Sequence, residues 1–151
     1  MKKILILILF LLYGCGYTSI YKNTDTLDFK INITSMSGNS EMNNLIKSEL
    51  NPFSKNNSSK KFNLNIDTKF EKIIISKKTS GAIDNYKIYV KTTFDVKLND
   101  KMKKLSFEEK FNIKNITNTF EQKRYEKIVK RNFASSIKEK LLIKLSSFND
   151  N

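Results

Sequence analysis

Residues 86–98 have the sequence YKIYVKTTFDVKL, and this stretch decides the fold. Apolar residues and one threonine occupy every second position without a fault, at Tyr86, Ile88, Val90, Thr92, Phe94, Val96 and Leu98. Successive side chains of a strand point to opposite faces of a sheet, so a period of two predicts a strand with one buried face. Because the alternate positions are mostly polar, we expect an antiparallel sheet that faces solvent on one side.

Two further alternating runs flank this stretch. The preceding run carries Phe62, Leu64, Ile66, Thr68 and Phe70 and continues into Ile73-Ile74-Ile75. The following run carries Leu105, Phe107, Glu109, Phe111 and Ile113, with Glu109 as its one charged member. Residues 76–85 (SKKTSGAIDN) and 99–102 (NDKM) have turn composition. The three runs are therefore predicted to form a meander joined by one long and one tight turn.

One more strand and two helices are predicted around the meander. Residues 27–34 alternate with Leu27, Phe29, Ile31 and Ile33 on one face. Residues 41–50 have helical spacing after a cap at Asn39 or Ser40, and Pro52 is expected to stop this helix. A second helix is expected from a cap at Asn118 or Thr119, with a stripe that covers the sheet: Tyr125, Ile128, Val129, Phe133, Ser136, Ile137, Leu141, Leu145 and Phe148.

The order strand, helix, three strands, helix predicts an α+β fold for a single domain at residues 27–148. The expected architecture is a two-layer sandwich with the order β-α-β-β-β-α. Two helices would pack on one face of a four-stranded mixed or antiparallel sheet. If the first helix connects two parallel strands, the sheet is mixed.

The first residues have the layout of an export signal. Lys2 and Lys3 precede nine apolar residues, Ile4 to Leu12, a run too short to be a permanent membrane span. Cys15, the only cysteine, follows Leu12-Tyr13-Gly14, and this order resembles the lipobox of bacterial lipoproteins, whose cysteine thiol is diacylated. We therefore expect a signal peptide at residues 1–14 and a lipidated tether at residues 15–26. An ordinary secretory signal with a chance cysteine is the alternative.

The composition limits the chemistry of the chain. It has no histidine, and Cys15 would be acylated, so His-based catalysis and His or Cys metal sites are excluded. We expect no enzyme, cofactor or metal. The formal charge of +13 comes almost wholly from lysine. It favours anionic partners such as phosphates or lipid headgroups, or it reflects the lysine bias of an AT-rich genome. Nucleic acid is not an expected partner of an exported protein.

The layout as a whole resembles the lipopolysaccharide-assembly lipoprotein family, LptE. The resemblance combines the segment Leu12 to Tyr17 (LYGCGY) with the order of strands and helices. It implies a protein anchored at the periplasmic face of the outer membrane. Members of the family plug the outer-membrane β-barrel LptD, help it to assemble, and assist delivery of lipopolysaccharide to the outer leaflet. They also bind lipopolysaccharide through basic residues. Gly16, rather than aspartate after the cysteine, agrees with sorting to the outer membrane.

Local charge density suggests which residues would meet these partners. Lys77 and Lys78 border the predicted long hairpin loop, and Lys101, Lys103 and Lys104 flank the tight turn, so these five are candidates for lipopolysaccharide binding. Tyr89 falls between the residues of its strand that are predicted to be buried, so its side chain is expected on the exposed face. It is the candidate for a partner interface. Two other functions remain open: an accessory lipoprotein of a periplasmic lipid or solute transport complex, with a ligand between helices and sheet, and a surface structural or pilot lipoprotein.

Overall fold

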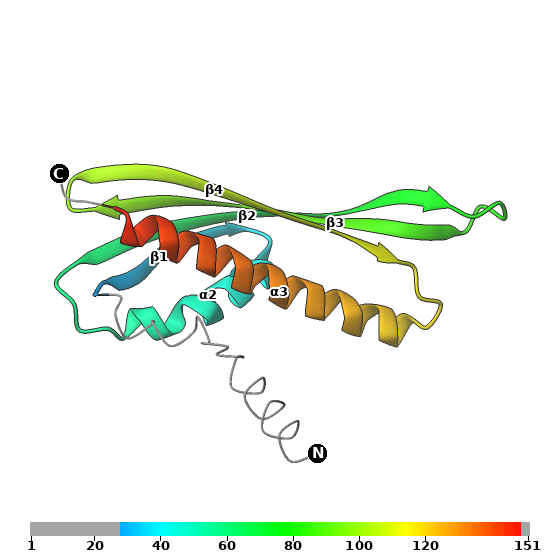
Figure 1. The fold of residues 1–151 in the computed structure, drawn as a ribbon, viewed down its shortest axis with the longest axis horizontal. Coiled ribbons are helices and arrows are strands. Elements are labelled where there is room, and N and C mark those ends of the chain that lie inside the picture. Colours follow the sequence, from blue (N-terminus) through cyan, green and yellow to red (C-terminus); the bar gives the residue numbers. More distant parts are fainter. Residues whose placement is uncertain (1–27, 149–151) are drawn as a thin grey trace, which may run out of the picture.

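Two helices lie against one side of a four-stranded sheet in the computed structural model, which describes residues 28–148 (Figure 1). The elements follow the predicted order: β1 (Lys30–Gly38), α2 (Ser40–Ser54), β2 (Lys61–Lys77), β3 (Ile83–Leu98), β4 (Lys101–Lys114) and α3 (Thr119–Ser146). The strands are ordered β1-β2-β3-β4 across the sheet. β1 is parallel to β2 and the other pairs are antiparallel, so the sheet is mixed. The predicted α+β fold is confirmed, whereas the signal at 1–14, the tether at 15–26 and Cys15 lie outside the described residues.

The core forms where the inward-facing side chains of the strands meet the helices. Phe62, Leu64 and Ile66 of β2 and Ile88 to Leu98 of β3 are buried at alternate positions, as the period of two predicts. Aromatic rings close one end of this core, with Phe62 edge-on to both Phe29 (5.4 Å between ring centroids) and Phe148 (5.6 Å). We call the sheet side that packs on the helices the inner face and the other side the outer face.

Both helices begin at the predicted asparagine caps. The side chain of Asn39 accepts a hydrogen bond from the backbone N–H of Met42 (3.0 Å), and that of Asn118 accepts from Phe120 (2.9 Å). The predicted stop at Pro52 is wrong, because α2 continues to Ser54. Pro52 lies in the last turn, where one missing N–H costs little, and the continued turn buries Phe53 against Phe29.

The predicted boundaries differ from the observed ones in three places. β1 is shifted toward Gly38, because Ser35 and Ser37 donate hydrogen bonds to Asn65 (2.9 Å) and Asp67 (2.7 Å) and thereby extend the ladder with β2. The loop between β2 and β3 comprises only residues 78–82, because pairing continues to the register of Lys77 with Ile83. The tight turn is Asn99-Asp100, and the residues predicted to complete it already belong to β4.

The meander is longer than the rest of the domain. β1 pairs with β2 only as far as Thr68, whereas β2 continues to Lys77. Figure 1 shows the ends of β2, β3 and β4 projecting beyond β1 and α2, with only the first turns of α3 below them. We call this projection, formed by residues 69–77, 83–91 and 108–114, the distal arm. The end of the sheet with the Asn99-Asp100 turn is the proximal end.

Candidate binding surface

The outer face of the sheet is strongly basic. Alternation and register place on it more lysines than carboxylates. The lysines are Lys30, Lys61, Lys69, Lys87, Lys91, Lys97, Lys104, Lys110 and Lys114; the carboxylates are Asp67, Glu71, Asp95 and Glu108. Neither helix covers this side (Figure 1). A face with one dominant charge sign raises the local concentration of anions, so the arrangement suits an anionic ligand or partner.

Tyr89 lies in the middle of this face, within a group of charged side chains. The ammonium of Lys91 is 2.9 Å from Glu108, and that of Lys69 is 2.6 Å from Glu71. Hydrogen bonds from Lys91 and from the Tyr89 hydroxyl hold the pKa of Glu108 below its usual range. Partial burial and donation to Glu108 raise the pKa of Tyr89. Tyr89 is thus on the outer face, as its phase predicts, but half-buried and held by Glu108.

The five lysines predicted to bind lipopolysaccharide do not lie together. Lys77 and Lys78 are exposed at the tip of the distal arm, where the N–H of Lys78 donates to the carbonyl of Ala82 (2.7 Å). Lys101, Lys103 and Lys104 lie at the proximal end, at the start of β4, where they pair with the end of β3. The 17 residues of β2 separate the two groups by roughly 50 Å at about 3.3 Å per residue.

Three of these lysines lie at the same end of the sheet as the start of β1. Lys30, near the start of the described chain, pairs with Lys61 at the proximal end, so the lysines that follow the tight turn share that end with it. Of these, Lys103 lies on the inner face with its ammonium 5.7 Å from the centre of the Phe148 ring, and Lys104 is 3.7 Å from Asp95 on the outer face. Successive hairpin turns of a meander lie at opposite ends of the sheet, which separates the two groups of lysines.

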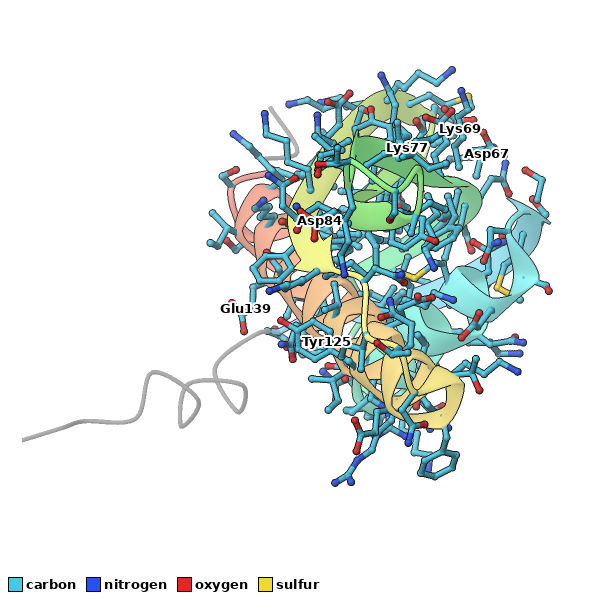
Figure 2. The ribbon with its side chains drawn as sticks, turned by 90° about the vertical axis from the view of Figure 1, so that its right-hand side faces the viewer. Asp67, Lys69, Lys77, Asp84, Tyr125 and Glu139 are labelled. Carbon is cyan, nitrogen blue, oxygen red and sulfur yellow. The ribbon has the colours of Figure 1, made fainter. Side chains whose placement is uncertain are left out.

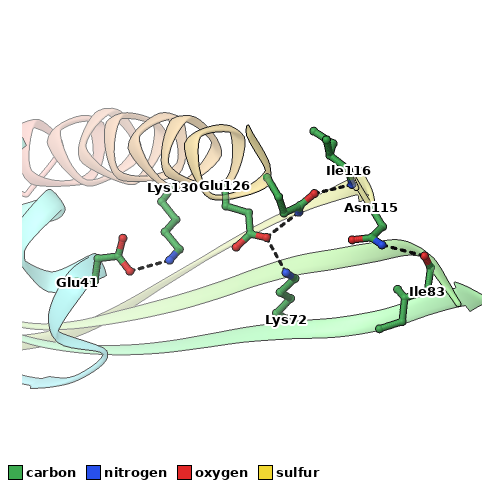
Figure 3. Close-up of polar contacts among 8 residues, drawn as sticks. Glu41, Lys72, Ile83, Asn115, Ile116, Glu126 and Lys130 are labelled. Carbon is green, nitrogen blue, oxygen red and sulfur yellow. Dashed lines mark hydrogen bonds and ion pairs between the residues drawn. The ribbon is translucent and has the colours of Figure 1, made fainter. Parts of the chain in front are cut away.

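Polar contacts fix α3 beneath the distal arm (Figure 3). The carboxylate of Glu126 accepts from the ammonium of Lys72 on β2 (2.6 Å) and from the amide of Gln122 (2.7 Å), while the side chain of Gln122 accepts from the N–H of Ile116 (2.8 Å). Partial burial would by itself raise the pKa of Glu126, but these hydrogen bonds and the charges of Lys72 and Lys130 outweigh burial and lower it.

The Glu126→Gln variant is expected to lose about 1–2 kcal/mol of the free energy of unfolding at pH 7, because Lys72 loses its charged partner. A carboxylate with a lowered folded pKa stabilises above the ordinary carboxyl pKa, and this contribution disappears as the pH falls through the lowered value. The difference between variant and wild type should therefore vanish in acid. Urea unfolding across the acidic range measures it. Asp100→Asn, at an exposed turn, is the control, and a constant deficit at every pH would contradict the assignment.

A groove lies at the edge of the sheet between β1 and α2. It measures about 210 Å³ and is lined by Lys30 to Ile33, Lys47, Leu50, Asn51 and Ser54. Pockets for drug-sized ligands start at roughly 300 Å³, so this groove is small for a lipid. Between the helices and the sheet, Phe62, Phe94 and Ile137 are fully buried members of one packed cluster.

Two features are absent from the described residues. In residues 28–148, no helix has both the length and the apolar character needed to cross a membrane. The same residues contain no group of three or more side chains of the metal-binding types.

Sequence reasoning predicted a polar outer face for the meander but missed that this face is basic. Lys87, Lys110 and Lys114 lie on it, with Lys110 opposite Tyr89 in the register, and none of them forms an ion pair with another described residue. The signal was present in the sequence, because these lysines occupy the polar phase of the same strands. Only the register of β3 with β4 reveals that they gather on one surface.

Solved structures of bacterial lipoproteins share this fold. Rare lipoprotein B from Shewanella oneidensis matches with a TM-score of 0.58 and 14% identity, covering 77% of this chain and 94% of that one. A minor lipoprotein from Acinetobacter baumannii matches at 0.53 and 12%, covering 76% and 93%. Lipoprotein B from Nitrosomonas europaea matches at 0.55 and 13%, covering 79% and 83%. No family model and no curated protein matches the sequence. The chain therefore has the fold of rare lipoprotein B.

Proposed function

We propose that this protein is a lipid-anchored lipoprotein of the outer membrane that binds the β-barrel LptD, helps it to assemble, and assists the delivery of lipopolysaccharide. The observation that carries the proposal is the shared fold, which extends over 77% of the chain and joins it to rare lipoprotein B. The lipobox-like segment ending at Cys15 precedes the region that shares this fold and supplies the means of anchoring.

The charge and shape of the domain support such a role. The interior of an outer-membrane barrel is polar, and a long sheet with an uncovered polar face offers it a matching surface. Lysine ammonium groups are compact point charges that suit the phosphates of lipopolysaccharide. The basic outer face provides several of them that have no ion-pair partner within residues 28–148, among them Lys87, Lys110 and Lys114. The protein acts in this proposal by binding, without catalysis.

Depletion of the protein in its own bacterium is expected to lower the amount of assembled LptD in the outer membrane severalfold. The wild-type gene should restore the barrel. A Cys15→Ser copy should restore much less, because without its acyl chains the protein leaves the membrane for the soluble fraction. Immunoblots of membrane fractions measure both proteins. A clean deletion with normal LptD assembly would refute the proposal.

A further inference from the structure

Strand β2 has an edge without a neighbour along the distal arm. β1 covers its first part, and the last pair of their register is Gly38 with Thr68. β2 then continues to Lys77 while β3 pairs with its other side. Within residues 28–148 no strand pairs with the remaining edge, and Figure 1 shows β1 and α2 ending before it. An open strand edge is a template for a further strand.

The backbone groups on this edge can be identified from one hydrogen bond. The carbonyl of Thr68 accepts from the N–H of Asn39 (2.7 Å), so the polar groups of Thr68 point toward the β1 side. Backbone groups of alternate residues point the same way, which places the N–H and C=O of Phe70, Lys72 and Ile74 on the open edge. The bulge that follows Ile74 ends this regular stretch.

The side chains around this edge are apolar to an unusual degree for a surface. Ile73 is 44% exposed on the outer face and Ile74 is 47% exposed on the inner face, so an added strand would gain apolar contacts on both sides. Open edges are usually protected by lysines that project over them. Lys72 does not do so, because its ammonium binds Glu126 and lies 3.9 Å from the centre of the Tyr86 ring.

The charged side chains around the edge indicate which kind of strand would bind there. Lys77 ends β2 near the tip and Lys78 follows it, while Lys69 lies on the outer face of β2. Figure 2 views the arm from its end and labels Lys69 and Lys77. On α3, Lys123 and Lys127 are exposed; Lys123 is three positions from Glu126 and Lys127 is three from Lys130, so they neighbour the residues of α3 that contact β2. The nearby carboxylates Glu71, Glu126 and Glu41 already have lysine partners. A second copy would carry the same strong positive charge and would be repelled.

We propose that the open edge of β2 from Lys69 to Ile74 binds an extended polypeptide strand that alternates apolar and acidic residues. The partner strand extends the sheet by hydrogen bonds to Phe70, Lys72 and Ile74. Its apolar residues lie on the outer face beside Ile73, and its carboxylates lie on the inner face, on the side of α3 with Lys123 and Lys127. This inference is independent of which membrane protein the domain serves.

A short synthetic peptide of alternating valine and glutamate tests the proposal on the full chain purified in detergent. At ten times its dissociation constant, the peptide should slow amide hydrogen exchange at Phe70, Lys72 and Ile74 about tenfold. A peptide with lysine in place of glutamate should give no protection. Ile74→Pro, which removes an edge N–H, should abolish the protection, whereas Ile74→Val should retain it.

A charge variant keeps the test decisive if the proline variant does not fold. Lys123→Glu combined with Lys127→Glu leaves the edge intact and should weaken binding of the acidic peptide while it permits binding of the basic one. Three outcomes would overturn the proposal: protection at the free edges of β1 or β4 instead, equal protection by both peptides, or protection that appears with protein concentration alone and so indicates self-pairing.

Discussion

Replacement of Gly38 by alanine is expected to lower the free energy of unfolding by about 3 kcal/mol or more. Gly38 ends β1 with a φ of +83°, a conformation that costs an L-residue about 1 kcal/mol. A Cβ here would also overlap the Thr68 carbonyl oxygen and lie 2.9 Å from its carbon. These are backbone atoms of the neighbouring strand, so β1 and β2 would have to separate. The hydrogen bond from Asn39 to Thr68, at the start of α2, would be lost with them.

Gly81 provides a matched control for this substitution. It has a nearly identical φ of +81°, but no atom lies within 4 Å of the position that its Cβ would take. Gly81→Ala should therefore cost only about 1 kcal/mol, the conformational part of the effect. Urea unfolding of the chain from residue 16 onward compares the two variants directly. Equal losses for both would mean that crowding between β1 and β2 contributes nothing.

Most of the sheet could be predicted because its buried side chains follow a strict period. Ile88 to Leu98 of β3 alternate in burial as their sequence alternates. The asparagine caps of both helices could be predicted for a similar reason, since capping is a local interaction of one side chain with the following turn. The end of α2 could not, because burial of Phe53 is a tertiary effect that overrides the local preference of Pro52.

The distal arm shows where the apolar pattern misleads. Ile73-Ile74-Ile75 has the composition of a buried strand, yet each residue is at least 44% exposed, because β1 and α2 end before they reach it. Tyr125 and Ile128 of the predicted helical stripe are 37% and 44% exposed, although Val129 beside them is buried. For the three isoleucines, the lengths of the neighbouring elements, which set how far each one extends, decide the exposure.

The types of residue in the candidate site could be predicted from the sequence, but their positions relative to one another could not. Tyr89 was found because phase alone assigns a residue to a face of the sheet. The lysines were sought at turns, and Lys77 and Lys104 proved to lie at opposite ends of the meander, since consecutive hairpin turns point in opposite directions. The basic outer face joins residues of all four strands and becomes visible only once the register is known.

The central claim is that this domain acts by fitting against a large membrane barrel. A sheet that is covered by helices on one side and basic on the other gives it a broad surface for such contact. Complexes of this kind are expected to be stable in mild detergent, because obligate interfaces bury more than about 2,000 Å². The anchor at Cys15 would keep both partners in the same membrane.

Affinity purification from detergent-solubilised envelopes, with a tag at the C-terminus, tests this claim most directly. We predict that one large β-barrel protein, LptD, is recovered in a one-to-one ratio with the tagged chain. A charge-matched lipoprotein of unrelated fold, carrying the same tag, should recover none. Recovery of the tagged chain without a barrel, or with soluble periplasmic proteins in its place, would contradict the account.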